Sequence, residues 1–186
     1  GRCAKPDCHD RMQPRTAQRN SILDARCGIT DDSALLSDDE ITSLIEHFVS
    51  AASLAAQAGF QFVDIKHCHG YLGHELLSGF DRPGKFGGSF ENRTRFLREI
   101  VDGIRSRTPS LEIAVRISIY DFLPFTQGPD DVGIPEENGD PRLIFGGDST
   151  GVGIDLYEPT KFLSLLQSLG IILVCTTAGS PYYNPH

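Results

Sequence analysis

A short stretch of the chain, residues 64–75, holds most of the side chains that could carry out chemistry. It reads Asp64-Ile65-Lys66-His67-Cys68-His69-Gly70-Tyr71-Leu72-Gly73-His74-Glu75. Acids, a lysine, histidines and a tyrosine this close together are costly to bury unless they find partners. The stretch follows an apolar run, so we expect it where a strand runs out into a loop.

Three interpretations of this stretch compete. A metal site would use His67, Cys68, His69 and His74. Adjacent strand residues point to opposite faces, so His67 and Cys68 could not easily bind one ion, and the spacing matches no standard zinc pattern. In a structural interpretation, hydrogen bonds satisfy these side chains at a loop edge. A binding and proton-transfer site explains the density of donors best.

The elements that must position this stretch show a repeating pattern. Ser37 and Glu40 have the spacing of a capping box, and apolar residues follow at helical spacing until Gly59. Phe60 to Ile65 then has the composition of a buried strand. Because side chains alternate along a strand, Asp64 and Lys66 should share a face.

The same helix-then-strand pattern occurs twice more. Ser89 is a plausible N-cap for a second amphipathic helix, which leads to a strand from Ile113 to Ile117. Pro159-Thr160 leads into a third helix, which is followed by the apolar run Ile171 to Cys175. Apolar strands that alternate with amphipathic helices predict parallel strands covered by helices, an α/β fold.

The prediction for residues 1–186 is a single incomplete domain with four parts. These are an irregular lead-in (1–36), core β/α units (37–118), a long loop or active-site lid (119–157), and a final helix and strand (158–186). No Gly-x-Gly-x-x-Gly motif follows a strand, which disfavours a dinucleotide-binding fold. Three strands cannot close an eight-stranded barrel.

Composition excludes several classes of partner. The net charge of -8 and the isoelectric point near 5.1 argue against a nucleic-acid surface or an anionic membrane. No apolar run approaches the roughly 20 residues that span a bilayer. The five cysteines, Cys3, Cys8, Cys27, Cys68 and Cys175, have no framework spacing. We expect reduced thiols and a cytoplasmic protein.

Four segments carry a resemblance to a known family. They are Ala58–Ile65, His69–Leu72, Glu75–Ser78 and Phe86–Leu97, the last reading Phe-Gly-Gly-Ser-Phe-Glu-Asn-Arg-Thr-Arg-Phe-Leu. In order and spacing, from about Phe48 to Ser118, the chain resembles the old yellow enzyme and 2,4-dienoyl-CoA reductase family. The resemblance implies an internal piece of a (β/α)8 TIM barrel, about strands 4 to 6 with their helices.

The resemblance also implies a role for several residues. Tyr71 matches the catalytic tyrosine that protonates the substrate, and His69 matches the second of two residues that bind the substrate carbonyl. Lys66 stands at the first of those positions, where the family usually has a histidine. Arg116 matches the arginine beside the flavin. His74 and Glu75 are expected to support the loop.

The implied activity is that of an FMN-dependent oxidoreductase. NAD(P)H would reduce FMN, and the flavin would reduce an activated C=C bond of a small-molecule substrate. No metal is implied at these residues, and the complete protein could form a homo-oligomer. Two alternatives stay open: a non-redox barrel lyase that uses Lys66 as a Schiff-base amine, and a catalytically inactive barrel fragment.

Overall fold

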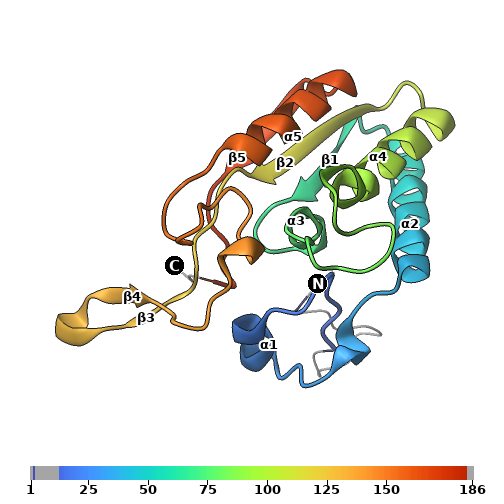
Figure 1. Cartoon of the computed structure of the whole chain (residues 1–186). Coiled ribbons are helices and arrows are strands. Elements are labelled where there is room, and N and C mark those ends of the chain that lie inside the picture. The colour runs from blue at the N-terminus through green and yellow to red at the C-terminus, as the bar shows by residue number, and fades with distance from the viewer. Residues whose placement is uncertain (1, 3–12, 184–186) are drawn as a thin grey trace.

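The computed structural model describes Arg2 and residues 13–183, which form an α/β fold around one parallel sheet (Figure 1). The sheet has the order β1-β2-β5, with β1 at Phe62–His67, β2 at Glu112–Ser118 and β5 at Leu173–Thr177. The main helices are α2 (Asp38–Gln57), α4 (Phe90–Arg107) and α5 (Tyr157–Ser168). The predicted α/β class with parallel strands is confirmed. Over the described residues the sheet is open and closes no barrel.

Two serine caps begin the helices where the sequence predicts. The Ser37 hydroxyl accepts from the Glu40 amide at 3.2 Å, while the Glu40 carboxylate accepts from the Ser37 amide at 2.8 Å. Ser89 accepts from the Asn92 amide at 3.2 Å at the start of α4. These bonds satisfy amide groups that have no partner within the helix.

Two strands begin two residues later than predicted, for the same reason. Gly59 and Gly170 have positive φ and end their helices in Schellman turns. In these turns the amides of Phe60 and Ile171 still donate to helix carbonyls, those of Ala55 and Leu166. The residue after each glycine is therefore committed to the turn, and pairing in the sheet starts only afterwards.

The helices cover one face of the sheet. Ile65, Val115 and Ile117 point into the main core, where they pack with residues of α2, α4 and α5. The third strand differs from the prediction, because Leu173 and Val174 are 46% and 37% exposed. The run at β5 is apolar, yet it forms an uncovered edge of the described sheet. Apolar composition alone cannot distinguish a central strand from an edge strand.

The described part of the lead-in, residues 13–36, contains helical structure where the prediction is an irregular segment. It contains helix α1 (Ser21–Cys27), which is capped by Asn20 at one end and by Gly28 at φ 67° at the other. A short 3₁₀ helix follows at Asp32–Ala34. Seven residues are too few to show a clear helical period, so the cap and the glycine were the only sequence signals.

The long segment 119–157 contains a small hairpin that projects from the body of the molecule (Figure 1). Strands β3 (Phe125–Gln127) and β4 (Gly133–Pro135) pair antiparallel around a 3₁₀ turn at Pro129–Asp131. A further 3₁₀ helix lies at Pro141–Leu143. The segment thus contains regular secondary structure. Its role as an active-site lid stays a prediction.

Candidate functional site

Charged side chains line the sheet face that the helices leave open. Lys66 is the register partner of Arg116, and Arg116 is the partner of Cys175, so the three lie side by side across the strands. Arg116 donates to the Asp64 carboxylate at 2.7 Å. Asp64 and Lys66 share a face, as predicted from strand alternation, but the carboxylate pairs with the guanidinium of the next strand.

Lys66 and Tyr71 are in direct contact. The Lys66 Nζ atom lies 3.5 Å from the centre of the Tyr71 ring, close enough for a cation–π interaction. Tyr71 precedes the short helix α3 (Leu72–Leu77), and its side chain is 44% exposed. Its ring also lies 5.9 Å from that of Tyr182. The phenol is therefore held beside a cation while it remains accessible.

His69 lies in the turn between β1 and α3. Its φ of 60° is unusual for a residue other than glycine, and its amide donates to the Ser118 hydroxyl at 3.1 Å. Burial lowers the pKa of His69, and the positive charges of Lys66 and Arg116 lower it further. The imidazole is therefore held neutral near two cations, where it can act as a hydrogen-bond donor.

His67 does not belong to this group. It points to the helix side of β1, where its ring packs 6.0 Å from Phe96 and 5.9 Å from Phe162. Burial lowers its pKa to about 4. Strand alternation sends the His67 and Lys66 side chains to opposite faces, so His67 cannot take the place of Lys66 on the open face. In residues 13–183 and Arg2, no group of three or more His, Cys, Asp or Glu side chains could hold a metal ion.

A largely apolar cavity of about 510 Å³ adjoins the Lys66–Tyr71 pair. Lys66, Tyr71 and Leu72 line one side, and Phe48 of α2 and Phe96 of α4 line another. An apolar cavity with a few polar groups is typical of a small-molecule site.

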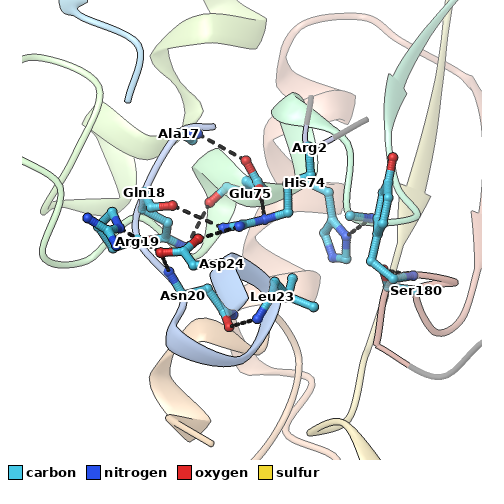
Figure 2. A network of polar contacts seen from close by, with 12 residues as sticks. Arg2, Ala17, Gln18, Arg19, Asn20, Leu23, Asp24, His74, Glu75 and Ser180 are labelled. Atoms are coloured by element: carbon cyan, nitrogen blue, oxygen red, sulfur yellow. Dashed lines mark hydrogen bonds and ion pairs between the residues drawn. The ribbon is translucent and has the colours of Figure 1, made fainter. Parts of the chain in front are cut away.

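His74 and Glu75 have the supporting positions that the sequence predicts. His74 Nδ1 accepts from the Gly70 amide at 2.9 Å. Figure 2 shows Glu75 in a buried network with Arg2, whose guanidinium lies 2.6 Å from Glu75 and 2.5 Å from Asp24. The pairing of Arg2 and Asp24 with this network could not be predicted, because both residues lie in the stretch that shows no sustained period.

Two further predictions meet the structure only in part. Cys68 and Cys175 are not joined in disulfides, whereas Cys3 and Cys8 lie outside the described residues. Within the described part of the chain, no helix is long and apolar enough to cross a bilayer.

Comparisons with known proteins identify relatives of this chain. Residues 1–133 match the NADH:flavin oxidoreductase / NADH oxidase family. The chain is 39% identical over 147 residues to an NADPH dehydrogenase of Bacillus subtilis (strain 168), covering 78% of this chain and 35% of that protein. It is 38% identical over 91 residues to 12-oxophytodienoate reductase 1 of Oryza sativa subsp. japonica, covering 47% of this chain and 24% of that protein.

Solved structures show the same fold. An old yellow enzyme homologue from Zymomonas mobilis aligns with a TM-score of 0.51 at 24% identity, over 79% of this chain and 35% of that one. A 2-naphthoyl-CoA reductase complex aligns with a TM-score of 0.55 at 23% identity, over 80% of this chain and 19% of that one. The chain therefore spans about a third or less of these relatives. On its match over residues 1–133, the chain belongs to the NADH:flavin oxidoreductase / NADH oxidase family.

Proposed function

We propose that this chain supplies the substrate-binding and proton-donating part of an FMN-dependent oxidoreductase that uses NAD(P)H to reduce an activated C=C bond. The observation that carries the proposal is the placement of Lys66, His69, Tyr71 and Arg116 at the carboxyl end of β1 and on the open sheet face. Family membership supports it, because the whole family is named for NADH and flavin.

We further infer that β1, β2 and β5 are successive strands, about the fourth to the sixth, of a (β/α)8 barrel. Both outer strands have no partner strand within the described residues, and the open face carries the polar side chains. In barrel enzymes the site lies at the carboxyl ends of the strands. The open face would then be the inside of the barrel.

Arg116 fits the place of a flavin-binding residue. Its Nε atom is buried and has no hydrogen-bond partner within the described residues, although one Nη atom pairs with Asp64. A fixed cation with a spare donor suits the N1 and O2 edge of an isoalloxazine ring, where negative charge gathers on reduction. FMN, once bound, would supply the hydride transfer. The residues of this chain would orient the substrate and move the proton.

The neutral imidazole of His69 and the ammonium of Lys66 would donate hydrogen bonds to the substrate carbonyl oxygen. Negative charge would develop on that oxygen during reduction, so these donors would act mainly in the transition state. The Tyr71 hydroxyl would then deliver its proton to the α-carbon. Because Lys66 adds a full positive charge, we propose substrates with an anionic group near the carbonyl.

The lyase alternative predicts different behaviour. Lys66 would form a Schiff base with a carbonyl substrate, and borohydride would trap the adduct at its Nζ atom. A protein of this kind would show neither flavin absorbance nor bleaching on addition of NADPH. The inactive-fragment alternative predicts flavin binding only in a longer protein that carries the remaining strands.

The test combines flavin titration with substitution of the tyrosine. In the protein extended by the remaining strands, FMN should bind and NADPH should bleach its absorbance, while the chain of residues 1–186 alone should bind FMN weakly. Tyr71→Phe should leave the bleaching rate unchanged and slow alkene reduction by about 100-fold. Tyr157→Phe, at an exposed tyrosine of α5, is the matched control. Unimpaired alkene reduction by Tyr71→Phe would contradict the proposal.

A further inference from the structure

A small internal cavity lies beneath the loop that carries His69 and Tyr71. Its volume is about 20 Å³, close to that of one water molecule on this measure. The polar side chains around it include Arg2, Glu75, His74, Asp121 and Tyr183. Figure 2 shows Arg2, Glu75 and His74 close together in this region.

Most of these polar groups already have partners. Arg2 and Glu75 are paired with each other, and the Tyr183 hydroxyl accepts from Asn20 at 2.9 Å. Two atoms are buried and have no partner within the described residues: Nε2 of His74 and Oδ2 of Asp121. The two residues are only 4% and 1% exposed, so bulk water does not reach them.

The two unpartnered atoms have complementary chemistry. His74 Nδ1 accepts the Gly70 amide hydrogen, so in the neutral ring the proton must lie on Nε2. Burial lowers the pKa of His74 to about 3, which keeps the ring neutral. Nε2 is therefore a donor that needs an acceptor. Burial raises the pKa of Asp121 to about 7, and the Phe122 amide donates to its Oδ1 atom at 2.9 Å. Above that pH the ionised carboxylate offers its Oδ2 atom as an acceptor that has no hydrogen-bond donor within the described residues. A water molecule can serve both.

We propose that one water molecule occupies this cavity, accepts a hydrogen bond from His74 Nε2 and donates one to Asp121 Oδ2. The bridge would make His74 and Asp121 positioning residues for the loop above them, since it fixes which ring nitrogen faces Gly70. The water site itself does not depend on the proposed function. Its consequence for catalysis by His69 and Tyr71 does rest on that function.

The conformation of the loop around Gly70 depends on the hydrogen bond that its amide donates to His74. Gly70 has φ 68°, and a Cβ added there would lie 2.6 Å from the Ser180 hydroxyl. Its neighbours are also held, because the His69 amide donates to Ser118 and the Tyr71 amide donates to the Cys68 carbonyl at 3.2 Å. Without the His74 acceptor, the Gly70 amide would lose its bond in the middle of this turn.

The first test is direct detection of the water in flavin-free protein. Nuclear Overhauser effects to the His74 Nε2 proton, assigned by its loss in His74→Asn, should reveal a long-lived water. A high-resolution crystal structure should place that water at hydrogen-bond distance from both atoms. A protein with no such water, or with His74 Nε2 bonded directly to Asp121, would overturn the proposal without any variant.

The second test measures hydrogen exchange of the Gly70 amide in Asp121→Leu. We expect the water signal to vanish and the exchange rate of Gly70 to rise at least about tenfold, while the β2 amides keep their protection. Asp121→Asn keeps an oxygen acceptor and should retain the water. Asp102→Leu, at an exposed position of α4, is the matched control. Unchanged Gly70 exchange in Asp121→Leu would refute the bridge. Flavin binding plays no part in these readouts, so the proposed function can fail independently.

Discussion

At the scale of single residues, the charge of Lys66 distinguishes this site. Its ammonium rests on the Tyr71 ring, while the nearest carboxylate of the strand, Asp64, is paired with Arg116. The charge is therefore available to a ligand that approaches the open face. It also lowers the pKa of His69 and so favours a neutral imidazole next to it.

This arrangement predicts selectivity for anionic substrates. In the flavin-loaded protein, Lys66→Met should raise KM about tenfold for an alkene that carries a carboxylate beside its carbonyl. For the matching neutral amide, KM should change by less than about twofold. Lys66→Arg keeps the positive charge, serves as the conservative control and should retain activity on both. Equal losses on both substrates would show that Lys66 acts by packing and not by charge.

His67 gives a prediction about pH. Its pKa is lowered to about 4 in the folded protein, whereas an unfolded chain binds the proton near 6.5. Between these values the unfolded state binds more protons, so the free energy of unfolding falls as pH drops from about 6.5 to 4. The loss should be on the order of 3 kcal/mol for this residue.

The measurement is urea unfolding across that pH range. His67→Leu should show a shallower decline, while His74 continues to contribute to the remaining slope. Above pH 7.5 the two proteins should respond to pH in parallel, which is the internal control. If the free energy of unfolding fell with pH as steeply in His67→Leu as in the unsubstituted protein, the pKa of His67 would not be lowered by folding, and this prediction would be wrong.

At the scale of elements, the packing of α2 against α4 depends on a glycine. A Cβ added to Gly103 would lie 2.5 Å from the Val49 Cγ2 atom. Helix propensity alone would favour alanine over glycine by about 1 kcal/mol. Steric conflict at this distance costs more, roughly 1–3 kcal/mol in a packed core.

We therefore predict that Gly103→Ala destabilises the protein although it is a better helix former. Val49→Ala should also destabilise, because it opens a cavity. In the double variant the new methyl group has room, so the total loss should be smaller than the sum of the two single losses. The test is a double-mutant cycle by chemical denaturation. Additive losses would show that the helices move apart instead.

At the scale of the whole molecule, a buried ion network connects the lead-in to helix α3, which follows the loop that carries His69 and Tyr71. Arg2 is 1% exposed and bonds Asp24 of α1 and Glu75 of α3. The Ala17 amide also donates to Glu75 at 3.0 Å. Burial raises the pKa of Glu75, and the charge of Arg2 opposes that rise. The network thus joins two segments that are far apart in the sequence, since Arg2 and Glu75 are separated by 73 positions.

Removing the central cation should therefore unfold more than one element. Arg2→Met should lower the free energy of unfolding by about 3–5 kcal/mol, because the buried Glu75 carboxylate loses its cation and Asp24 keeps only its pair with Arg19. Adding Glu75→Gln should restore part of that loss, since the uncompensated carboxylate is removed and Asp24 stays paired with Arg19. Arg142→Met, which breaks the pairs of an exposed arginine with Asp81 and Asp140, is the control and should have little effect. A small loss in Arg2→Met would show that water reaches the network.

Much of the architecture could be predicted because its signals are local. The serine caps, the helical stripes and the apolar strands each depend on residues within one or two turns of one another. The same locality predicted that Asp64 and Lys66 share a face. Local patterns did not predict where β1 and β5 begin, because a Schellman turn includes the residue after the glycine. They also did not predict α1, which is too short to show a helical period.

The sequence by itself determined the α/β class, the helix starts and the stretch that carries the candidate chemistry. Only the tertiary structure decided the pairings of Arg116 with Asp64 and of Arg2 with Glu75, and only it placed His74 and Asp121 around one cavity. The reason is physical. Local sequence patterns determine the backbone dihedral angles and which face of a helix or strand a side chain lies on. The partner of a buried polar group is determined instead by the packing of distant segments, which brings that partner within about 3 Å.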